Sequence, residues 1–323
     1  MFKNNLIAIV FSLVFIAACG GGGGGGSPTP SEPSPTASLS ASSSSVILDT
    51  VITLTWSSTN ATSCSASGTW TGTKAISGTE DVTISTPGDN AFGINCTGAG
   101  GSASASAIVE GYRNTDGVSV DGYIRQADIF IDTNDSYTAD GDEDTTTSDN
   151  DGKFTIKYSD GNLISLGGTD LDSGNALDNL LIMHKLSGHS DFKAVTPVTS
   201  VAAFMTDASL VNAALGIDLS LDISVVDPVV GKGDGGINDY LYEKGNQLTI
   251  LAYALQNITN NLNTTTETTQ DYFKAIAEEL DIEYTATEAR VNIETEAFIT
   301  KVLNNVVESK SLTLDDTNKA NTI

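Results

Sequence analysis

Residues 51–57, Val-Ile-Thr-Leu-Thr-Trp-Ser, alternate apolar and polar side chains with a period of two. Successive side chains of a β-strand point to opposite faces, so Ile52, Leu54 and Trp56 share one face. This is the pattern of a half-buried antiparallel strand. The stretch therefore predicts a strand with one face in a core.

The same alternation returns in AFGINCT at residues 91–97 and in ASASAIV at residues 103–109. Turns rich in Ser, Gly and Asn separate these short apolar segments. Several short strands with frequent turns are typical of two packed sheets. The sequence predicts a small β-sandwich over residues 37–110.

Residues 1–18 have the features of an export signal. Lys3 supplies a positive end, and LIAIVFSLVF at residues 6–15 is apolar but short for a bilayer span. The closing IAAC resembles the bacterial lipobox, which implies a lipoprotein signal peptide and lipid, such as palmitate, on Cys19. Gly20, in place of Asp, implies sorting to the outer membrane. The alternative is an ordinary secretory signal followed by a chance Cys.

Residues 19–36 contain an unbroken Gly run at 20–26 followed by a Pro-rich segment. Neither part can bury enough apolar surface to fold by itself. The sequence predicts a lipidated Gly/Pro-rich tether that spaces the body from the membrane. A specific role for the polyglycine is the alternative.

The chain has three cysteines. If Cys19 carries lipid, Cys64 and Cys96 remain as one pair in an oxidising compartment, where a disulfide is the expected state. A bridge that closes a loop of about thirty residues stabilises the fold by roughly 3 to 4 kcal/mol. Two free buried thiols are the alternative.

TLTWSSTNATSCSASGTW at residues 53–70 and INCTGAGGSASASAIV at residues 94–109 resemble the immunoglobulin-like (Ig-like) modules of bacterial surface proteins. The resemblance implies a spacer or a binding surface. Trp56 precedes Cys64, whereas antibody-type domains place the Trp after the first Cys. The antibody arrangement of Trp against the bridge is therefore not implied.

The chain is strongly acidic, with 15 Lys and Arg against 41 Asp and Glu and a formal charge of −26. Such a field repels phosphate backbones, so no nucleic-acid partner is expected. It favours solubility and cation binding. Hydrophobic residues at 39%, together with many Ser, Thr and Gly, favour secreted β structure over a disordered acidic tail.

Residues 111–196 are predicted to form a second β module. Apolar side chains alternate from Ala127 to Ile131 before an acidic loop, and again from Phe154 to Tyr158 after it. LLIMHKL and FKAVT, separated by SGHSD, predict a further hairpin.

Residues 197–323 change to helical spacing. VTSVAAFM, ASLVNAALGI, DYLYEKGNQLTILAYALQNITNNL, DYFKAIAEEL and EAFITKVLNNVV each carry apolar residues on one helix face. These stretches predict a helical bundle that packs on itself or on the second β module. Binding of a partner to the apolar stripes is the alternative.

The strongest chemical signal is the acidic loop at residues 132–143. Oxygen ligands recur at positions one, three, five, seven, nine and twelve of a calcium loop, and this set consists of Asp132, Asn134, Ser136, Thr138 through its carbonyl, Asp140 and Glu143. Calcium takes six to eight oxygens in irregular geometry, which suits this set better than the octahedron of magnesium. The spacing predicts a calcium site.

Two features depart from an EF-hand. The sixth residue is Tyr137, where Gly normally makes the sharp turn. The flanking segments are predicted strands instead of helices. A solvated acidic loop without metal is the alternative, because no Lys or Arg lies between Arg125 and Lys153.

GYIRQADIFIDTNDSYTADGDEDTTTSDNDGKFTI at residues 122–156 resembles modules of bacterial adhesins and surface lipoproteins. VTPVTSV and the helices after it resemble the sequel to that module in large marine adhesins. The resemblance implies a prealbumin-like β-sandwich that uses the acidic loop for calcium. The expected fold class is thus mainly β with α: an Ig-like sandwich, a prealbumin-like module and a C-terminal helical bundle.

No enzymatic motif stands out. His184 and His189 lack a zinc spacing such as H-E-x-x-H and are expected to be structural or exposed. Gly231–Gly236 matches G-x-G-x-x-G by letter but follows no predicted strand of a βαβ unit. A connection, or a weak cation turn using Asp234 and Asp239, is the preferred interpretation. Carboxylate pairs for glycoside hydrolysis remain open, since nothing selects one pair.

The sequence therefore predicts a non-enzymatic, outer-membrane lipoprotein at the cell surface that acts in adhesion or structural interaction. Its expected partners are the membrane, through the lipid, and an extracellular protein or glycan. The alternative is a carbohydrate-binding accessory lipoprotein that uses exposed aromatics such as Trp70. A hydrolase is the third hypothesis.

Overall fold

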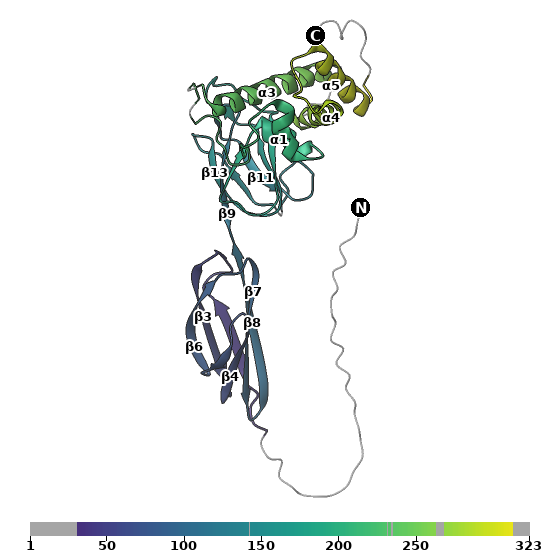
Figure 1. Ribbon diagram of the computed structural model, residues 1–323. Helices are drawn as coiled ribbons and strands as arrows, with labels where there is room; N and C mark the ends of the chain where they lie inside the picture. Colours follow the sequence, from purple (N-terminus) through teal and green to yellow (C-terminus); the bar gives the residue numbers. More distant parts are fainter. Residues whose placement is uncertain (1–30, 142, 231, 234, 263–267, 313–323) are drawn as a thin grey trace, which may run out of the picture.

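A computed structural model describes residues 31–312, except 142, 231, 234 and 263–267. More of its residues lie in strands (37%) than in helices (26%), and five α-helices follow near its C-terminal end, which confirms the predicted class of mainly β with α. Figure 1 shows two bodies joined end to end: a sandwich at residues 36–112 and a distal body at residues 114–312.

The sandwich consists of two sheets with the strand orders β1-β3-β6 and β2-β8-β7-β4-β5. Its strands are β1 (Thr36–Ala41), β2 (Ser45–Ile47), β3 (Thr50–Thr59), β4 (Ser63–Gly68), β5 (Gly72–Lys74), β6 (Ser77–Ile84), β7 (Gly88–Gly98) and β8 (Gly101–Tyr112). The predicted alternation in β3 is confirmed, because Ile52, Leu54 and Trp56 are all buried whereas Val51 is 58% exposed.

The predicted disulfide joins Cys64 to Cys96. The two residues are register partners on the neighbouring strands β4 and β7, so the bridge lies within one sheet. Antibody domains instead join their two sheets by a disulfide. The bridge therefore fastens two adjacent strands and leaves the contact between the sheets to side-chain packing.

Trp70 belongs to the sandwich core. It is only 4% exposed, its ring meets Trp56 edge to face at 5.3 Å, and its indole nitrogen donates to the carbonyl of Gly93. The expectation that Trp70 is an exposed aromatic for glycans is therefore wrong. An apolar ring with one satisfied donor gains more by burial than by exposure.

The distal body contains three sheets with the orders β12-β11-β14-β16, β13-β9-β17 and β10-β15. Its strands are β9 (Asn114–Ser119), β10 (Ile124–Arg125), β11 (Asp128–Asp132), β12 (Thr145–Thr147), β13 (Lys153–Lys157), β14 (Gly161–Leu166), β15 (Thr169–Asp170), β16 (Leu181–Leu186) and β17 (Phe192–Val195). The hairpin predicted between LLIMHKL and FKAVT is wrong. β16 pairs with β14 and β17 pairs in parallel with β9, so the turn between them carries the chain from one sheet to another.

The helices lie at the predicted stretches: α1 (Pro197–Phe204), the short 3₁₀ turn η1 (Ala208–Leu210), α2 (Val211–Leu215), α3 (Ile237–Leu262), α4 (Gln270–Thr287) and α5 (Glu296–Ser309). Thr196 and Thr199 form a capping box that starts α1, and Pro197 fits the first helical position because it needs no amide partner. One hydrophobic cluster runs from Ile129 of β11 to Phe273 of α4. The helices therefore pack on the second β module.

The junction between the two bodies is short. Only Arg113 separates β8 from β9, and its carbonyl accepts the amide of Tyr158 at 2.8 Å. The Lys157 ammonium lies 2.6 Å from Glu110 of β8 and 5.3 Å from the centre of the Tyr112 ring. Contacts from both sides of the junction thus restrict rotation between the bodies. Among the described residues, no helix has the length and apolarity needed to cross a bilayer.

Candidate metal centre

The acidic loop begins where β11 ends. Asp132 is the last residue of that strand and is only 1% exposed. Its Oδ1 accepts the amides of Asn134 and Ser136, both at 3.1 Å, and its Oδ2 accepts the amide of Tyr137 at 3.0 Å. A buried carboxylate requires such partners because water no longer solvates it. The loop thus wraps its backbone around one fixed anion.

The next four predicted ligands gather in the same turn. Asn134 Oδ1 accepts the Ser136 amide at 2.9 Å, and Ser136 Oγ donates to the Thr138 carbonyl at 3.0 Å. Asp140 Oδ2 accepts Asn134 Nδ2 at 2.8 Å and Ser136 Oγ at 3.3 Å. Alternating residues of the loop are therefore linked in one hydrogen-bonded turn, in which Asn134 presents its amide nitrogen to Asp140 and its oxygen to the Ser136 amide.

Glu143, the sixth predicted ligand, lies across the mouth of the loop. Its Oε1 accepts the Thr133 amide at 2.8 Å and its Oε2 accepts the Asp140 amide at 3.1 Å. Both carboxylate oxygens are thus held by backbone amides, and each keeps a further lone pair that is able to bind a cation. In the described part of the chain, no group of three or more His, Cys, Asp or Glu is placed to hold a metal. The predicted donor set combines the carboxylates of Asp132, Asp140 and Glu143 with neutral oxygens, and calcium accepts both kinds.

Tyr137 explains how the loop turns without the usual Gly. Its φ is 58°, in the left-handed region where Gly normally serves, at a cost of about 1 to 2 kcal/mol for a residue with a Cβ. The ring lies 6.3 Å from that of Phe204 in α1 and joins a cluster with Phe130 and Ile164. A hydrogen bond links its side chain to Gln270 of α4. Packing against the helices thus offsets the backbone strain.

Asn162 is a contributor that the sequence pattern did not identify. It is the register partner of Asp132 on the neighbouring strand β14, and its Nδ2 donates to Asp135 Oδ1 at 2.8 Å. This contact fastens the loop to the sheet. Only strand register brings the two segments together, so no local signal in the sequence indicates it.

The histidines and the Gly-rich segment lie outside this loop. His189 Nε2 is 2.9 Å from the carbonyl of Asn114, and the His189 ring meets Tyr158 edge to face. His184 borders a cavity beside β16. Asp239 accepts the amides of Gly233 and Gly235. Asp234, the other acid of the alternative cation turn, lies outside the described residues.

Cys19, the predicted lipidation site, also lies outside the described residues. Neither a protein-family model nor a curated protein matches this chain.

Proposed function

We propose that the protein is a surface-exposed outer-membrane lipoprotein in which calcium, bound by loop 132–143, stabilises a distal body that acts in adhesion or structural interaction. The observation that carries this proposal is the single hydrogen-bonded turn that holds Asp132, Asn134, Ser136, Thr138 and Asp140 together, with the sequence spacing of a calcium loop. Lipid on Cys19 anchors the chain, and residues 19–36 give it reach.

The two bodies have different tasks in this proposal. An Ig-like sandwich is the spacer, because its in-sheet disulfide and its short junction to β9 resist bending. A prealbumin-like module presents the calcium loop. Tyr137 connects that loop to α1 and α4, so a cation that fixes the loop also fixes part of the helical layer.

The electrostatics of the loop favour a cation. Between Arg125 and Lys153 the sequence contains no Lys or Arg, so the segment carries no positive side chain of its own to compensate its carboxylates. Calcium would neutralise part of this repulsion and replace the internal hydrogen bonds of Asn134, Ser136 and Asp140. Modules of the extracellular type bind calcium with Kd of about 0.1 to 1 mM.

Calorimetric titration of the purified protein tests the metal site. At 10 mM calcium, a Kd near 0.3 mM corresponds to about 2 kcal/mol of added stability of the folded state. Asp140→Asn removes an exposed ligand charge and should weaken binding about tenfold. Asp128→Asn is the matched control, because Asp128 is an exposed acid of the same strand outside the loop. Absence of heat and of a thermal shift at 10 mM calcium would contradict the proposal.

Two measurements on cells test the placement. Intact-mass analysis of the native product should show an acylated Cys19, and an unmodified thiol or an uncleaved leader contradicts the anchor. Protease treatment of intact cells should remove the body of the protein. Survival of the body while surface controls are cut contradicts an outward-facing adhesin.

A further inference from the structure

The sheet β12-β11-β14-β16 has one face that α1 and the acidic loop cover only in part. Phe204 of α1 and Tyr137 of loop 132–143 pack on Phe130 and Ile164 of this face. Toward β12 a cleft of approximately 440 Å³ is left open beside the loop. Its lining includes Asp128 of β11, Thr145 and Thr147 of β12, Leu166 of β14 and Ala139 of the loop. None of these residues is a predicted calcium ligand, so the cleft is a second candidate site.

Strand register brings the polar groups of the cleft together. Asp128 is the register partner of Thr147, and Phe130, two residues further along β11, is the partner of Thr145. Side chains at alternate positions of a strand share a face at a spacing of about 7 Å, and neighbouring strands are about 5 Å apart. One carboxylate and two hydroxyl groups therefore surround a space that a single polar group of a ligand can fill.

These polar groups are accessible to a ligand. Asp128, Thr145 and Thr147 are all exposed. Within the described residues, the Asp128 carboxylate makes no hydrogen bond and no ion pair. Leu166 is half-buried and Ala139 is exposed, so they offer apolar surface next to the polar groups. The cleft thus combines a free carboxylate with an apolar wall.

The charge of the cleft has one sign. Among the described residues that line it, Asp128 is the only charged one. The sequence has no Lys or Arg between Arg125 and Lys153, and the whole chain has a formal charge of −26. Such a field attracts cations to the protein and repels anions. The cleft therefore favours a cationic ligand.

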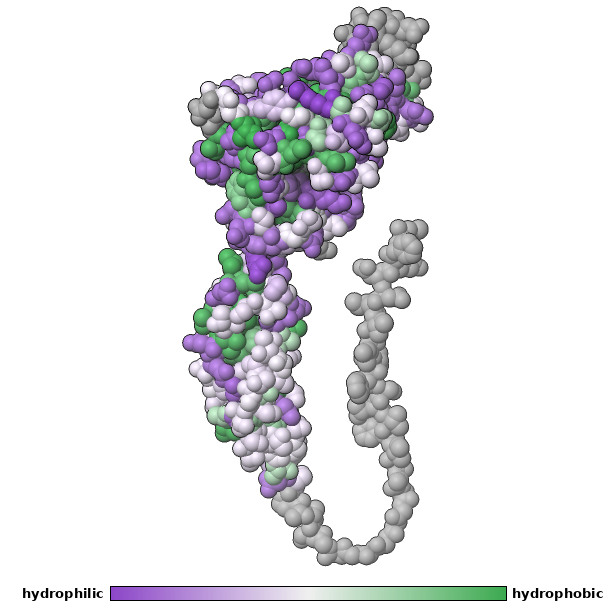
Figure 2. Space-filling model, viewed as in Figure 1, coloured by the Kyte–Doolittle hydropathy of each residue, from purple (hydrophilic) through white to green (hydrophobic). Residues whose placement is uncertain are grey.

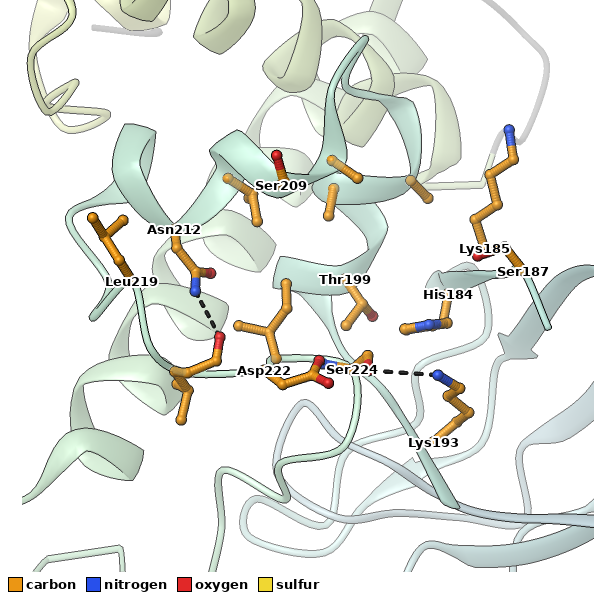
Figure 3. Close-up of a pocket in the computed structure, with 16 residues that line it drawn as sticks. His184, Lys185, Ser187, Lys193, Thr199, Ser209, Asn212, Leu219, Asp222 and Ser224 are labelled. Carbon is orange, nitrogen blue, oxygen red and sulfur yellow. Dashed lines mark hydrogen bonds between the residues drawn. The ribbon is translucent and has the colours of Figure 1, made fainter. Parts of the chain in front are cut away.

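The cavity beside β16 differs in this respect. Figure 3 shows Lys193 directed toward Ser224, with Asp222 next to them and Lys185 farther away. Lys193 Nζ lies 3.5 Å from Ser224 Oγ, and the Asp222 carboxylate accepts the Ser224 amide at 3.0 Å. Charges of both signs thus line that cavity and are partly satisfied within it. It selects no charge, and the cleft at β12 is the stronger candidate.

We infer that the cleft at β12 binds a lysine side chain presented by a partner protein. The ammonium group has three donors and no acceptor, which matches the Asp128 carboxylate and the hydroxyls of Thr145 and Thr147. The four-carbon stem lies along Leu166 and Ala139, because lysine stems cover apolar surface while the charged end stays polar. The inference rests on the proposed role in adhesion and names the chemistry of the partner. One such contact has a Kd on the order of 1 mM, and many copies on one cell add avidity.

Ligand-observed NMR on the full chain in metal-free buffer tests the inference. The probe is N-acetyl-lysine N-methylamide at 10 mM. The norleucine analogue keeps the stem without the charge, and ethanolamine keeps the charge without the stem. The lysine probe should show saturation transfer, and both controls should bind at least threefold more weakly. Absence of lysine binding, or equal binding of either control, overturns the inference. Since calcium is left out, a negative calcium titration does not affect this result.

Two matched substitutions locate the binding. Asp128→Asn removes the carboxylate charge and should weaken lysine binding about fivefold. Asp89→Asn makes the same change at an exposed acid of β7 in the sandwich and should leave binding unchanged. Asp128→Asn should also keep the calcium affinity of the wild type, so the cleft and the metal site are tested separately. Equal losses in the two variants overturn the site, because lysine would then respond only to the overall charge.

A lysine placed within the chain gives an independent test. Thr147→Lys sets an ammonium opposite Asp128 and should abolish binding of the probe, since the cleft is then occupied from within. Position 147 is exposed on an edge strand, where lysine is well tolerated. Thr83→Lys adds the same charge to an exposed position of β6 in the sandwich and should leave binding unchanged. Circular dichroism confirms folding of each variant, and unchanged binding in Thr147→Lys overturns the inference.

Discussion

The sandwich and the distal body satisfy their buried polar groups in different ways. In the sandwich, Asn90 is buried and its Nδ2 donates to the Thr86 carbonyl at 2.9 Å. Across the described residues, every buried side-chain nitrogen or oxygen without a hydrogen-bond partner belongs to the distal body, including those of His184 and Asn212. Unsatisfied groups destabilise a fold unless something else binds them. In the described part of the chain, unsatisfied buried polar groups are therefore a feature of the distal body and not of the sandwich.

The surfaces of the two bodies also differ in hydropathy. Figure 2 shows the visible face of the sandwich as largely pale, of intermediate hydropathy, and that of the distal body as a mixture of strongly hydrophilic and hydrophobic areas. Ser, Thr, Ala and Gly on the outer strands account for the pale surface. Such a surface suits a spacer, since it offers few anchors for a partner.

The largest expected difference between the two bodies is in how their free energies of unfolding depend on pH. Burial, and then the charge of Asp170, raises the pKa of Asp121 to about 7, although a hydrogen bond from Thr249 opposes this. The folded state binds this proton more tightly than the unfolded state. The contribution of Asp121 is therefore fully present below pH 4 and is lost as the pH rises through 7, by on the order of 4 kcal/mol.

Calorimetric scans between pH 4 and pH 8 measure this effect. Asp121→Asn keeps the size of the side chain and should remove the loss of stability with rising pH from the transition of the distal body. The opposite slope that remains between pH 4 and 6.5 belongs to His184, whose pKa burial lowers to about 4. The transition of the sandwich should not change. Equal slopes in the wild type and the variant would show that Asp121 is not the titrating group.

Removal of the disulfide should act on the sandwich alone. Cys64→Ala with Cys96→Ala is expected to lower the free energy of unfolding of the sandwich by about 3 to 4 kcal/mol, since the unfolded segment regains its loop entropy. Calcium binding should stay within about twofold of the wild type, because loop 132–143 lies in the other body. A matched loss of calcium affinity would mean that the two bodies are coupled through the junction.

Local patterns in the sequence predicted the elements better than their partners. Alternation identified Ile52, Leu54 and Trp56 as one buried face, because the period of a strand depends only on its own residues. The pairing of β16 with β14 instead of β17 could not be predicted, since register is decided by segments distant in the sequence.

The same distinction, between features set by neighbouring residues and features set by segments distant in the sequence, applies to the loop at residues 132–143 and to the cavity beside β16. The predicted calcium ligands are close in sequence, so their spacing alone indicated the candidate site. His184 of β16 and Asn212 of α2 border one cavity with α1 between them, and α1 packs against β16, where Ser200 Oγ accepts the Met183 amide at 2.8 Å. No local pattern in the sequence indicates that these two residues border the same cavity. Trp70 was expected to be a surface aromatic but is a core residue. Its burial likewise depends on residues that are distant in the sequence.

Tyr137 gives the smallest and most specific test, because it connects the loop to the helices. Tyr137→Gly relieves the left-handed φ of 58° but removes the contact with Phe204 and the hydrogen bond with Gln270. The gain and the loss nearly offset, so stability should fall by only about 1 kcal/mol. The backbone path of the loop is one that Gly adopts readily, so calcium affinity should change by less than about threefold.

The transmission of the calcium effect should nevertheless be lost in this variant. Hydrogen exchange in the wild type is expected to slow in α1 and α4 when calcium is added, since the bound loop holds the Tyr137 ring against both helices. In Tyr137→Gly the slowing should be confined to the loop. Tyr137→Phe keeps the ring and loses only the hydroxyl, so it should retain the slowing in α1. If all three proteins slow equally in both helices, the loop acts on the helical layer by another route, such as the Asn162 contact with Asp135.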